Sequence, residues 1–290
     1  MKITVHKIFI YFLILIGVLT SVAILIRNFD YYILPIEERP FHVRYETLKP
    51  SGTETHGYGI VGSMMIIFGV AMYSSRKRVH AFKQVGKIKY FLEFHIFLCL
   101  VGPILILYHT TFKFGGLVAV SFWSMTAVVL SGIVGRYVYL QIPKGILGNE
   151  LSIQELDEKN KELYLRLKNE FGLDETDLQS LDSLARPVNE ITSIFNLILF
   201  FIKSDFTRRS RVNKIIHHLH SKKIEHGLIH SVTVIVKERI QLLQRIYFME
   251  ELKNIFHYWH IVHLPFTIIM FVILLIHVAV ALSFGYTWIF

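Results

Sequence analysis

Hydrophobic residues gather in long runs along this chain, separated over most of its length by short polar stretches. Five runs are each close to 20 residues, the length that crosses about 30 Å of hydrocarbon as an α-helix. They cover residues 8–26, 57–74, 90–111, 116–140 and 261–284. The pattern therefore predicts an all-α integral membrane protein with five transmembrane helices.

Residues 144–258 have a different pattern, with leucines and charged residues alternating at helical spacing. This stretch predicts a helical insertion outside the membrane. It divides the chain into residues 1–143, which hold four spans, the insertion at 144–258, and residues 259–290, which hold the fifth span. Within the insertion, the 12 apolar-leaning residues 191–202 are too few to cross unaided. They predict an interfacial helix on the inner leaflet, with a sixth span as the alternative.

The distribution of charge predicts an orientation. Residues 75–89 contain six basic residues and no acidic one: Arg76, Lys77, Arg78, Lys83, Lys87 and Lys89. Basic loops remain in the cytoplasm. The N-terminus and the insertion are therefore predicted to be cytoplasmic and the C-terminus outside, in a multi-pass protein of the inner (cytoplasmic) membrane. Basic residues in such loops explain the net charge of +9, so no nucleic-acid partner is expected.

The composition excludes several classes of protein and cofactor. With 53% hydrophobic residues and a mean hydropathy of +0.46, the chain is too apolar for a soluble domain of this size. Its single cysteine, Cys99, excludes a disulfide framework, an iron–sulfur ligand set and covalent haem attachment. No glycine-rich dinucleotide motif or Walker loop is present, which argues against a flavin or nicotinamide domain in this chain.

Two spans carry paired histidines at equal spacing. His95 and His109 are fourteen residues apart in the third span, as are His263 and His277 in the last. Fourteen helical residues turn through about 1400° and rise about 21 Å, so each pair shares one face at two depths. Imidazole inside a bilayer usually has a proton-path or metal-binding role. The matched spacing favours two b-type haems, with these four histidines as the axial ligands of the haem iron.

The number of spans decides how the histidines pair. With five spans the third and fifth run parallel, so His95 lies at the depth of His263, and His109 at that of His277. A sixth crossing would pair His95 with His277 instead. The short run at 191–202 favours five spans. The other interpretation, histidines that only hydrogen-bond within the helix packing, would suit one histidine better than four in two equal spacings.

Other residues are weaker candidates for this chemistry. Arg136, at the inner end of the fourth span, could pair with a haem propionate, although interfacial snorkelling explains it as well. His260 could contact a quinone or relay a proton near the inner haem. Glycines that could make room for the macrocycles, or simply pack helices, are Gly102, Gly116, Gly132 and Gly135.

The sequences around these histidines resemble the bacterial di-haem membrane cytochrome b family, which includes ferric reductase-like transmembrane domains and quinone-linked cytochrome b subunits. The similar segments include Leu-Glu-Phe-His95-Ile-Phe, Gly102 to Thr110, Ser-Gly-Ile-Val-Gly-Arg136-Tyr and Trp-His-Ile-Val-His263-Leu-Pro. The resemblance implies a four-helix haem-binding bundle with His95, His109, His263 and His277 as ligands. The long insertion and the missing flavin domain depart from a self-contained ferric reductase.

These observations predict an electron-transport cytochrome, the electron-transfer subunit of an oxidoreductase complex, that carries electrons across the bilayer. The expected partners are membrane lipid, a quinone or quinol, and a peripheral or soluble redox protein. The alternative is a non-catalytic membrane anchor or sensor whose active part is residues 144–258. A proton-coupled transporter would need acidic residues in the spans, where only Glu93 is found.

Overall fold

A computed structural model describes residues 5–82, 85–142, 153–185, 196–197, 199–204 and 226–286. The regular structure in these residues is helical, with no strand among them, which confirms the predicted all-α class. The chain forms two compact units, Met1–Leu130 with His263–Phe290, and Ser131–Val262. Helices α6 and α11 contribute to both units.

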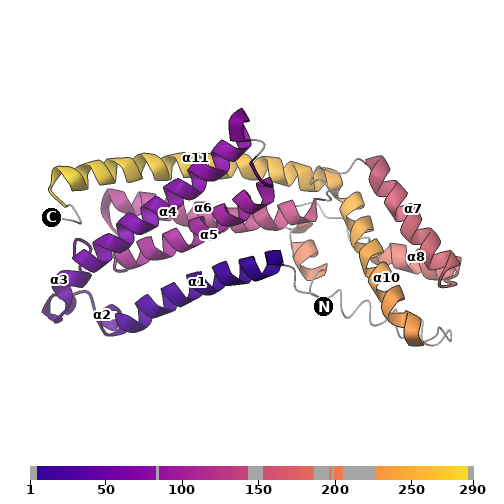
Figure 1. The fold of residues 1–290 in the computed structure, drawn as a ribbon, viewed down its shortest axis with the longest axis horizontal. Coiled ribbons are helices and arrows are strands. Elements are labelled where there is room, and N and C mark those ends of the chain that lie inside the picture. Colours follow the sequence, from indigo (N-terminus) through magenta and orange to yellow (C-terminus); the bar gives the residue numbers. More distant parts are fainter. Residues whose placement is uncertain are drawn as a thin grey trace. The chain divides into compact units, whose positions relative to one another are not determined.

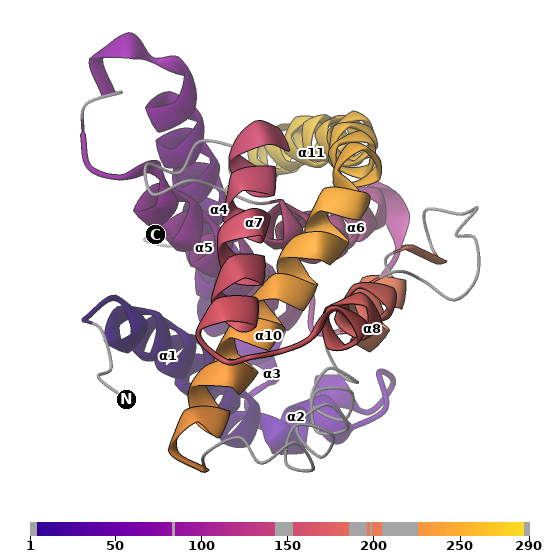
Figure 2. The same ribbon diagram turned by 90° about the vertical axis from the view of Figure 1, so that its right-hand side faces the viewer.

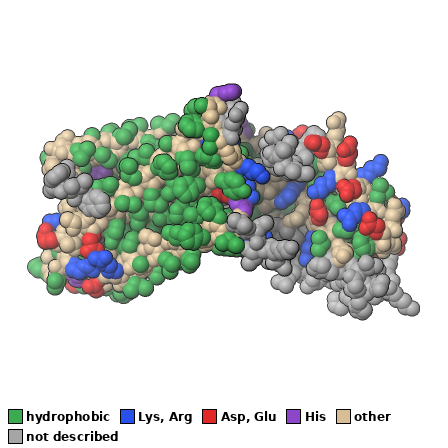
Figure 3. All heavy atoms as spheres, in the orientation of Figure 1, with side chains coloured by type: hydrophobic (Ala, Val, Ile, Leu, Met, Phe, Trp, Pro, Cys, Tyr) green, Lys and Arg blue, Asp and Glu red, His purple; other side chains and the backbone are tan. Residues whose placement is uncertain are grey.

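Five of the described helices are long and apolar enough to cross a membrane, as the sequence predicts. They are α1 (Val5–Arg27), α4 (Thr53–Arg78), α5 (Ile88–His109), α6 (Gly116–Gln141) and α11 (Met249–Ser283). Large apolar side chains of α1 are exposed around the helix, and hydrophobic side chains predominate over the middle of the face formed by α1, α4 and α5 (Figure 3). A surface of this kind suits contact with lipid.

Four of these helices begin earlier than the hydrophobic runs that predict them, α4 and α11 by the most. Helix α4 starts at Thr53, so residues 53–56 belong to the helix and not to the preceding loop. Helix α11 starts at Met249, directly after a break at Phe248 that separates it from α10. Polar residues at a helix end lower the local hydropathy without preventing helix formation, so hydropathy alone places the boundary too late.

Helices α4 and α5 form a closely packed antiparallel pair (Figure 1). They approach most closely where Gly62 meets Gly102, since a Cβ on either glycine would lie 2.7–2.8 Å from the backbone oxygen of the other. The prediction that Gly102 makes room for a macrocycle is therefore wrong. The absence of a side chain there lets two helix backbones touch, as small residues commonly do in membrane helices.

Four helices share a small core midway along the first unit. Ile66 of α4, Met125 of α6 and Met270 of α11 are buried together, and Ile106 of α5 packs against them. The hydroxyl of Ser121 on α6 donates to the backbone oxygen of Met270 at 3.2 Å. Met270 lies seven residues from both His263 and His277, so this core falls between the two predicted histidine levels.

Helix α1 packs on the outside of α5. The Tyr108 hydroxyl donates to the backbone oxygen of Ser21 at 3.0 Å. Near the N-terminal ends of α1 and α5, His6 Nε2 lies 3.2 Å from Oε1 of Glu93, whose side chain is only 8% exposed. Glu93, the acidic residue considered for proton transport, is thus part of the contact between α1 and α5.

The connection from α1 to α4 is compact, with short helices α2 (Phe29–Ile33), η1 (Arg39–Phe41) and α3 (Tyr45–Leu48). The buried Arg39 guanidinium donates to backbone oxygens of Tyr32, Leu34 and Thr111 at 3.0, 3.0 and 2.6 Å. Thr111 and Phe112 have positive φ angles of 51° and 61°, which residues other than glycine rarely adopt. The hydrogen bond from Arg39 to Thr111 therefore stabilises the tight turn that follows α5.

In the second unit, α7 (Ile153–Asn169) and α8 (Glu175–Ala185) lie against α10 (His226–Tyr247), as Figure 2 shows. Their facing sides form a core that includes Leu156, Leu163, Leu178, Val232 and Val236. The heptad-like spacing of the leucines puts them on one face of α7, with charged residues on the other. The predicted helices of residues 144–258 are present where this stretch is described.

Residues 196–197 and 199–204 are helical and lie within the predicted interfacial segment 191–202 and just beyond it. Leu197 and Phe201 are buried against Val138 of α6 and Leu252 of α11. Residues 191–195 and 198 lie outside the described residues. The described turn is too short to cross a membrane, and its apolar face packs on protein.

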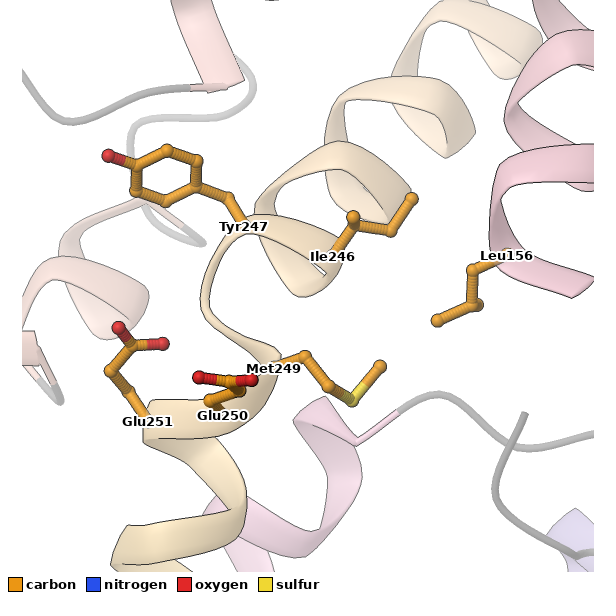
Figure 4. A pocket seen from close by; sticks show the side chains of 6 residues that line it. All are labelled: Leu156, Ile246, Tyr247, Met249, Glu250 and Glu251. Atoms are coloured by element: carbon orange, nitrogen blue, oxygen red, sulfur yellow. The ribbon is translucent and has the colours of Figure 1, made fainter. Parts of the chain in front are cut away.

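The break between α10 and α11 borders a small cavity of about 180 Å³ (Figure 4). Side chains from α7, α10 and the first turn of α11 line it: Leu156, Ile246, Tyr247, Met249, Glu250 and Glu251. The two glutamates stand at the positive end of the α11 dipole, where carboxylates are stabilised.

Candidate functional site

His109 is the last residue of α5, and its ring is held by α4. The Nδ1–H group donates to the backbone oxygen of Thr55 at 2.9 Å. A carbonyl can only accept a hydrogen bond, so the proton must be on Nδ1. Nε2 is then left with its lone pair, the form in which a neutral imidazole binds a metal.

His95 is held in the same way fourteen residues earlier. Its Nδ1–H donates to the backbone oxygen of Gly69 at 3.1 Å. The two acceptors, Thr55 and Gly69, are also fourteen residues apart, because α4 and α5 run antiparallel with the Gly62–Gly102 contact at the midpoint. One helix pair therefore presents two histidines with the same tautomer at two levels.

The surroundings of the two rings differ. Gly59 makes room for His109, since a Cβ there would lie 2.8 Å from Cγ and Nδ1 of the ring. At the equivalent position beside His95 stands Tyr73, whose ring stacks on the imidazole with 5.3 Å between centres. Cys99 Sγ lies 3.5 Å from His95 Nδ1. The two levels are thus related by the repeat but chemically distinct.

The structure brings His277 of α11 to His109. Their ring centres are 6.4 Å apart, and both side chains are half-buried. The pairing of these residues requires α5 and α11 to run parallel, as the five-span prediction does. The antiparallel arrangement, which would pair His109 with His263, is not what the structure shows.

A histidine that the sequence prediction left in the loop also lies here. His56, in the first turns of α4, has its ring centre 6.1 Å from that of His109. The hydropathy boundary at residue 57 excluded it from the span. A usable signal was Gly52 followed by Thr53, a small residue and a polar one at a helix start, which extends the helix far enough to include it.

The remaining candidates take different positions. His263 is half-buried on α11 in the same unit as His95, and its backbone oxygen accepts a hydrogen bond from the Thr267 hydroxyl at 2.8 Å. Pairing of His263 with His95 stays a prediction. His260 is exposed, and its Nδ1–H donates to the backbone oxygen of Phe256 at 2.9 Å.

Arg136 and Gly135 belong to the second unit. The Arg136 guanidinium lies 5.6 Å from the ring centre of Tyr139, and its predicted contact with a propionate stays a prediction. Gly135 lies directly against the indole of Trp259, whose Nε1–H donates to the backbone oxygen of Ser131 at 2.7 Å. The prediction that Gly135 makes room for a macrocycle is wrong, because Trp259 occupies that space.

The spacing at His109 can be compared with two kinds of metal centre. No cluster of three or more histidine, cysteine, aspartate or glutamate side chains in the described part of the chain could hold a bare metal ion. An iron bonded to two imidazoles at about 2 Å from each nitrogen instead leaves their ring centres about 6 Å apart. The 6.4 Å between His109 and His277 fits such an axial pair.

Comparison with protein-family models, with known proteins and with solved structures found no match for this chain.

Proposed function

We propose that this chain is a di-haem b-type membrane cytochrome, the electron-transfer subunit of a membrane oxidoreductase. The observation that carries the proposal is the repeated anchoring of His95 and His109 on α5. Each donates its Nδ1 proton to a carbonyl of α4, and each keeps Nε2 as an acceptor.

This anchoring is what metal ligation needs. A hydrogen bond from the second ring nitrogen fixes the tautomer and orientation of a ligating histidine and makes the ligating nitrogen more basic. Histidines that only hydrogen-bond within the helix packing would also donate to a carbonyl, but that role does not require two such bonds on one helix face with Nε2 left as an acceptor at both levels. The repeat therefore favours ligation over simple helix packing.

The positions of the other helices support the same assignment. His277 is spaced from His109 as an axial pair would be, and the core around Ile66, Met125 and Met270 separates the two levels. In this proposal His109 and His277 hold one haem, the His109 site. His95 and His263 hold the other, the His95 site.

Bound haem would supply one-electron redox chemistry at each level. The chain's own residues hold the imidazoles, exclude water with the apolar faces of α4, α5, α6 and α11, and keep the two levels apart. The proposed partners are a quinone or quinol dissolved in the lipid and a peripheral or soluble redox protein. The described helices α7, α8 and α10 carry charged faces on which such a protein could dock.

The proposed orientation of the chain in the membrane rests on the basic loop at residues 75–89, because loops rich in Lys and Arg stay in the cytoplasm. The N-terminus and residues 144–258 lie in the cytoplasm, and the C-terminus lies outside, in the inner membrane of a bacterium. The His109 site is then near the outer surface and the His95 site near the cytoplasm.

The test is an optical spectrum of the detergent-purified protein, oxidised and then reduced with dithionite, together with a pyridine haemochrome assay of haem per chain. Two low-spin b haems are expected. A colourless protein from haem-replete cells would refute the proposal.

Single substitutions sharpen this test. His95→Ala and His109→Ala should each remove one haem and leave the other, because the two levels are separate. His80→Ala is the matched control, since His80 is exposed in the short helix η2 (His80–Phe82) and should retain both haems. Full haem content in both of the first two variants would contradict the ligand assignment.

A membrane anchor or sensor is the second candidate. It is favoured by the core of α7, α8 and α10, which buries its own set of leucines and valines and has a small cavity at its edge. In this alternative residues 144–258 are the active part and the spans hold it at the membrane. It predicts a protein without haem.

A further inference from the structure

We propose that the His109 site contains three histidines, and that His56 is a second residue able to complete the axial pair with His109. Either His56 or His277 would then face His109 across the bound iron. This inference rests on the proposed function and adds to it a residue from a third helix.

The geometry places His56 and His277 at nearly equal distances from the same ring. The His109 ring centre is 6.1 Å from that of His56 and 6.4 Å from that of His277. Two imidazoles on one iron have ring centres about 6 Å apart. Both distances therefore suit an axial partner of His109, although a haem iron can accept only one of them in addition to His109.

The three rings differ in how they are held. His109 is anchored through Nδ1 to the backbone oxygen of Thr55. Within the described residues no hydrogen bond to the ring of His56 or of His277 is found. His109 is thus the fixed ligand, and no hydrogen bond among the described residues fixes the orientation of the other two rings.

The helix repeat shows that this feature belongs to one level only. Fourteen residues relate Thr55 to Gly69, the acceptors of His109 and His95, and the same step relates His56 to Val70. Valine has no metal-binding atom. The His95 site therefore lacks a counterpart of His56, which makes His56→Val a natural test because it copies the residue at the other level.

The experiment compares His56→Val, His277→Ala and the double variant with the unaltered protein. Haem per chain is measured by pyridine haemochrome, and the spin state by electron paramagnetic resonance of the oxidised protein. Both single variants should retain two low-spin haems. The double variant should lose the low-spin signal of one haem, leaving that haem high-spin or unbound.

The haem at the His95 site serves as an internal control for folding, because its low-spin signal should persist in every variant. Loss of one low-spin signal in His277→Ala alone, to the extent seen in the double variant, would overturn the inference. Loss of one low-spin signal in His56→Val alone would also overturn the inference, since His56 would then be the sole axial partner of His109. A colourless unaltered protein would instead refute the proposed function itself.

Discussion

At the scale of single residues, two backbone carbonyls determine what the α5 histidines can do. The oxygens of Thr55 and Gly69 select the Nδ1–H tautomer of His109 and His95. Carbonyls have no sequence signature, so the spacing of the histidines predicts their shared face but not the form of their rings. That form depends on which residues of α4 lie opposite.

A second residue-scale feature is the buried arginine beside the His109 site. Arg39 donates to three backbone oxygens, including that of Thr111, two residues beyond His109. Its side chain also lies over the ring of Tyr31, 5.3 Å from the ring centre. The sequence does not show that Arg39 is buried, because it lies in a polar stretch between two hydrophobic runs.

Arg39→Gln should destabilise the protein, because a glutamine cannot donate to three oxygens that are separated in this way. One buried and two partly buried carbonyls left without donors cost about 2–4 kcal/mol in total, which corresponds to a fall in Tm of about 5–10 °C. Thermal unfolding in detergent, followed by circular dichroism, measures the change. Lys49→Gln is the control, since Lys49 pairs with the exposed Glu46 and should change Tm little. Equal Tm values for both variants would contradict this role of Arg39.

At the scale of helices, the antiparallel register of α4 and α5 organises the candidate site. The Gly62–Gly102 contact fixes this register, and the two histidine–carbonyl hydrogen bonds lie seven residues to either side of it. The hydrophobic runs predicted five spanning helices, and five of the described helices are long and apolar enough to cross a membrane. They could not predict which helices touch, so for Gly102 and Gly135 the sequence left both haem contact and helix packing open, and the structure shows packing at both.

Gly59→Ala tests whether this close approach positions the His109 ring. The added Cβ would lie 2.8 Å from the ring, so the imidazole must shift and give up its hydrogen bond to Thr55. One haem should then be lost or become high-spin, while alanine favours the helix itself by about 1 kcal/mol. Haem content and spin state measure the effect.

Gly17→Ala is the matched control for that variant. Gly17 is also in a spanning helix, and its added Cβ would meet a methyl group of Val101 at 3.0 Å, away from the histidines. The control should retain both haems. If Gly59→Ala also retained two low-spin haems, the fit of the His109 ring against Gly59 would not matter for the site.

At the scale of the whole molecule, the number of crossings determines which histidines share a depth. Five spans make α5 and α11 parallel, and the contact between His109 and His277 requires this. Only part of residues 191–202 is described, and that part packs on protein at Leu197 and Phe201. The sequence favoured five spans because this run is short, and the histidine contact supplies an independent reason.

Cysteine labelling of intact cells tests the crossing number directly. Glu158→Cys on α7 and Glu238→Cys on α10 stand before and after residues 191–202, and both side chains lie on charged helices. With five spans, a membrane-impermeant maleimide should label neither until the cells are permeabilised, whereas Tyr286→Cys, beyond α11, should be labelled at once. A sixth crossing would expose position 238 and hide position 286.

Cys99, within α5, should remain unlabelled in intact cells and provides the background for this labelling experiment. Labelling of positions 158 and 238 from opposite sides would therefore pair His95 with His277 and overturn the arrangement of both sites.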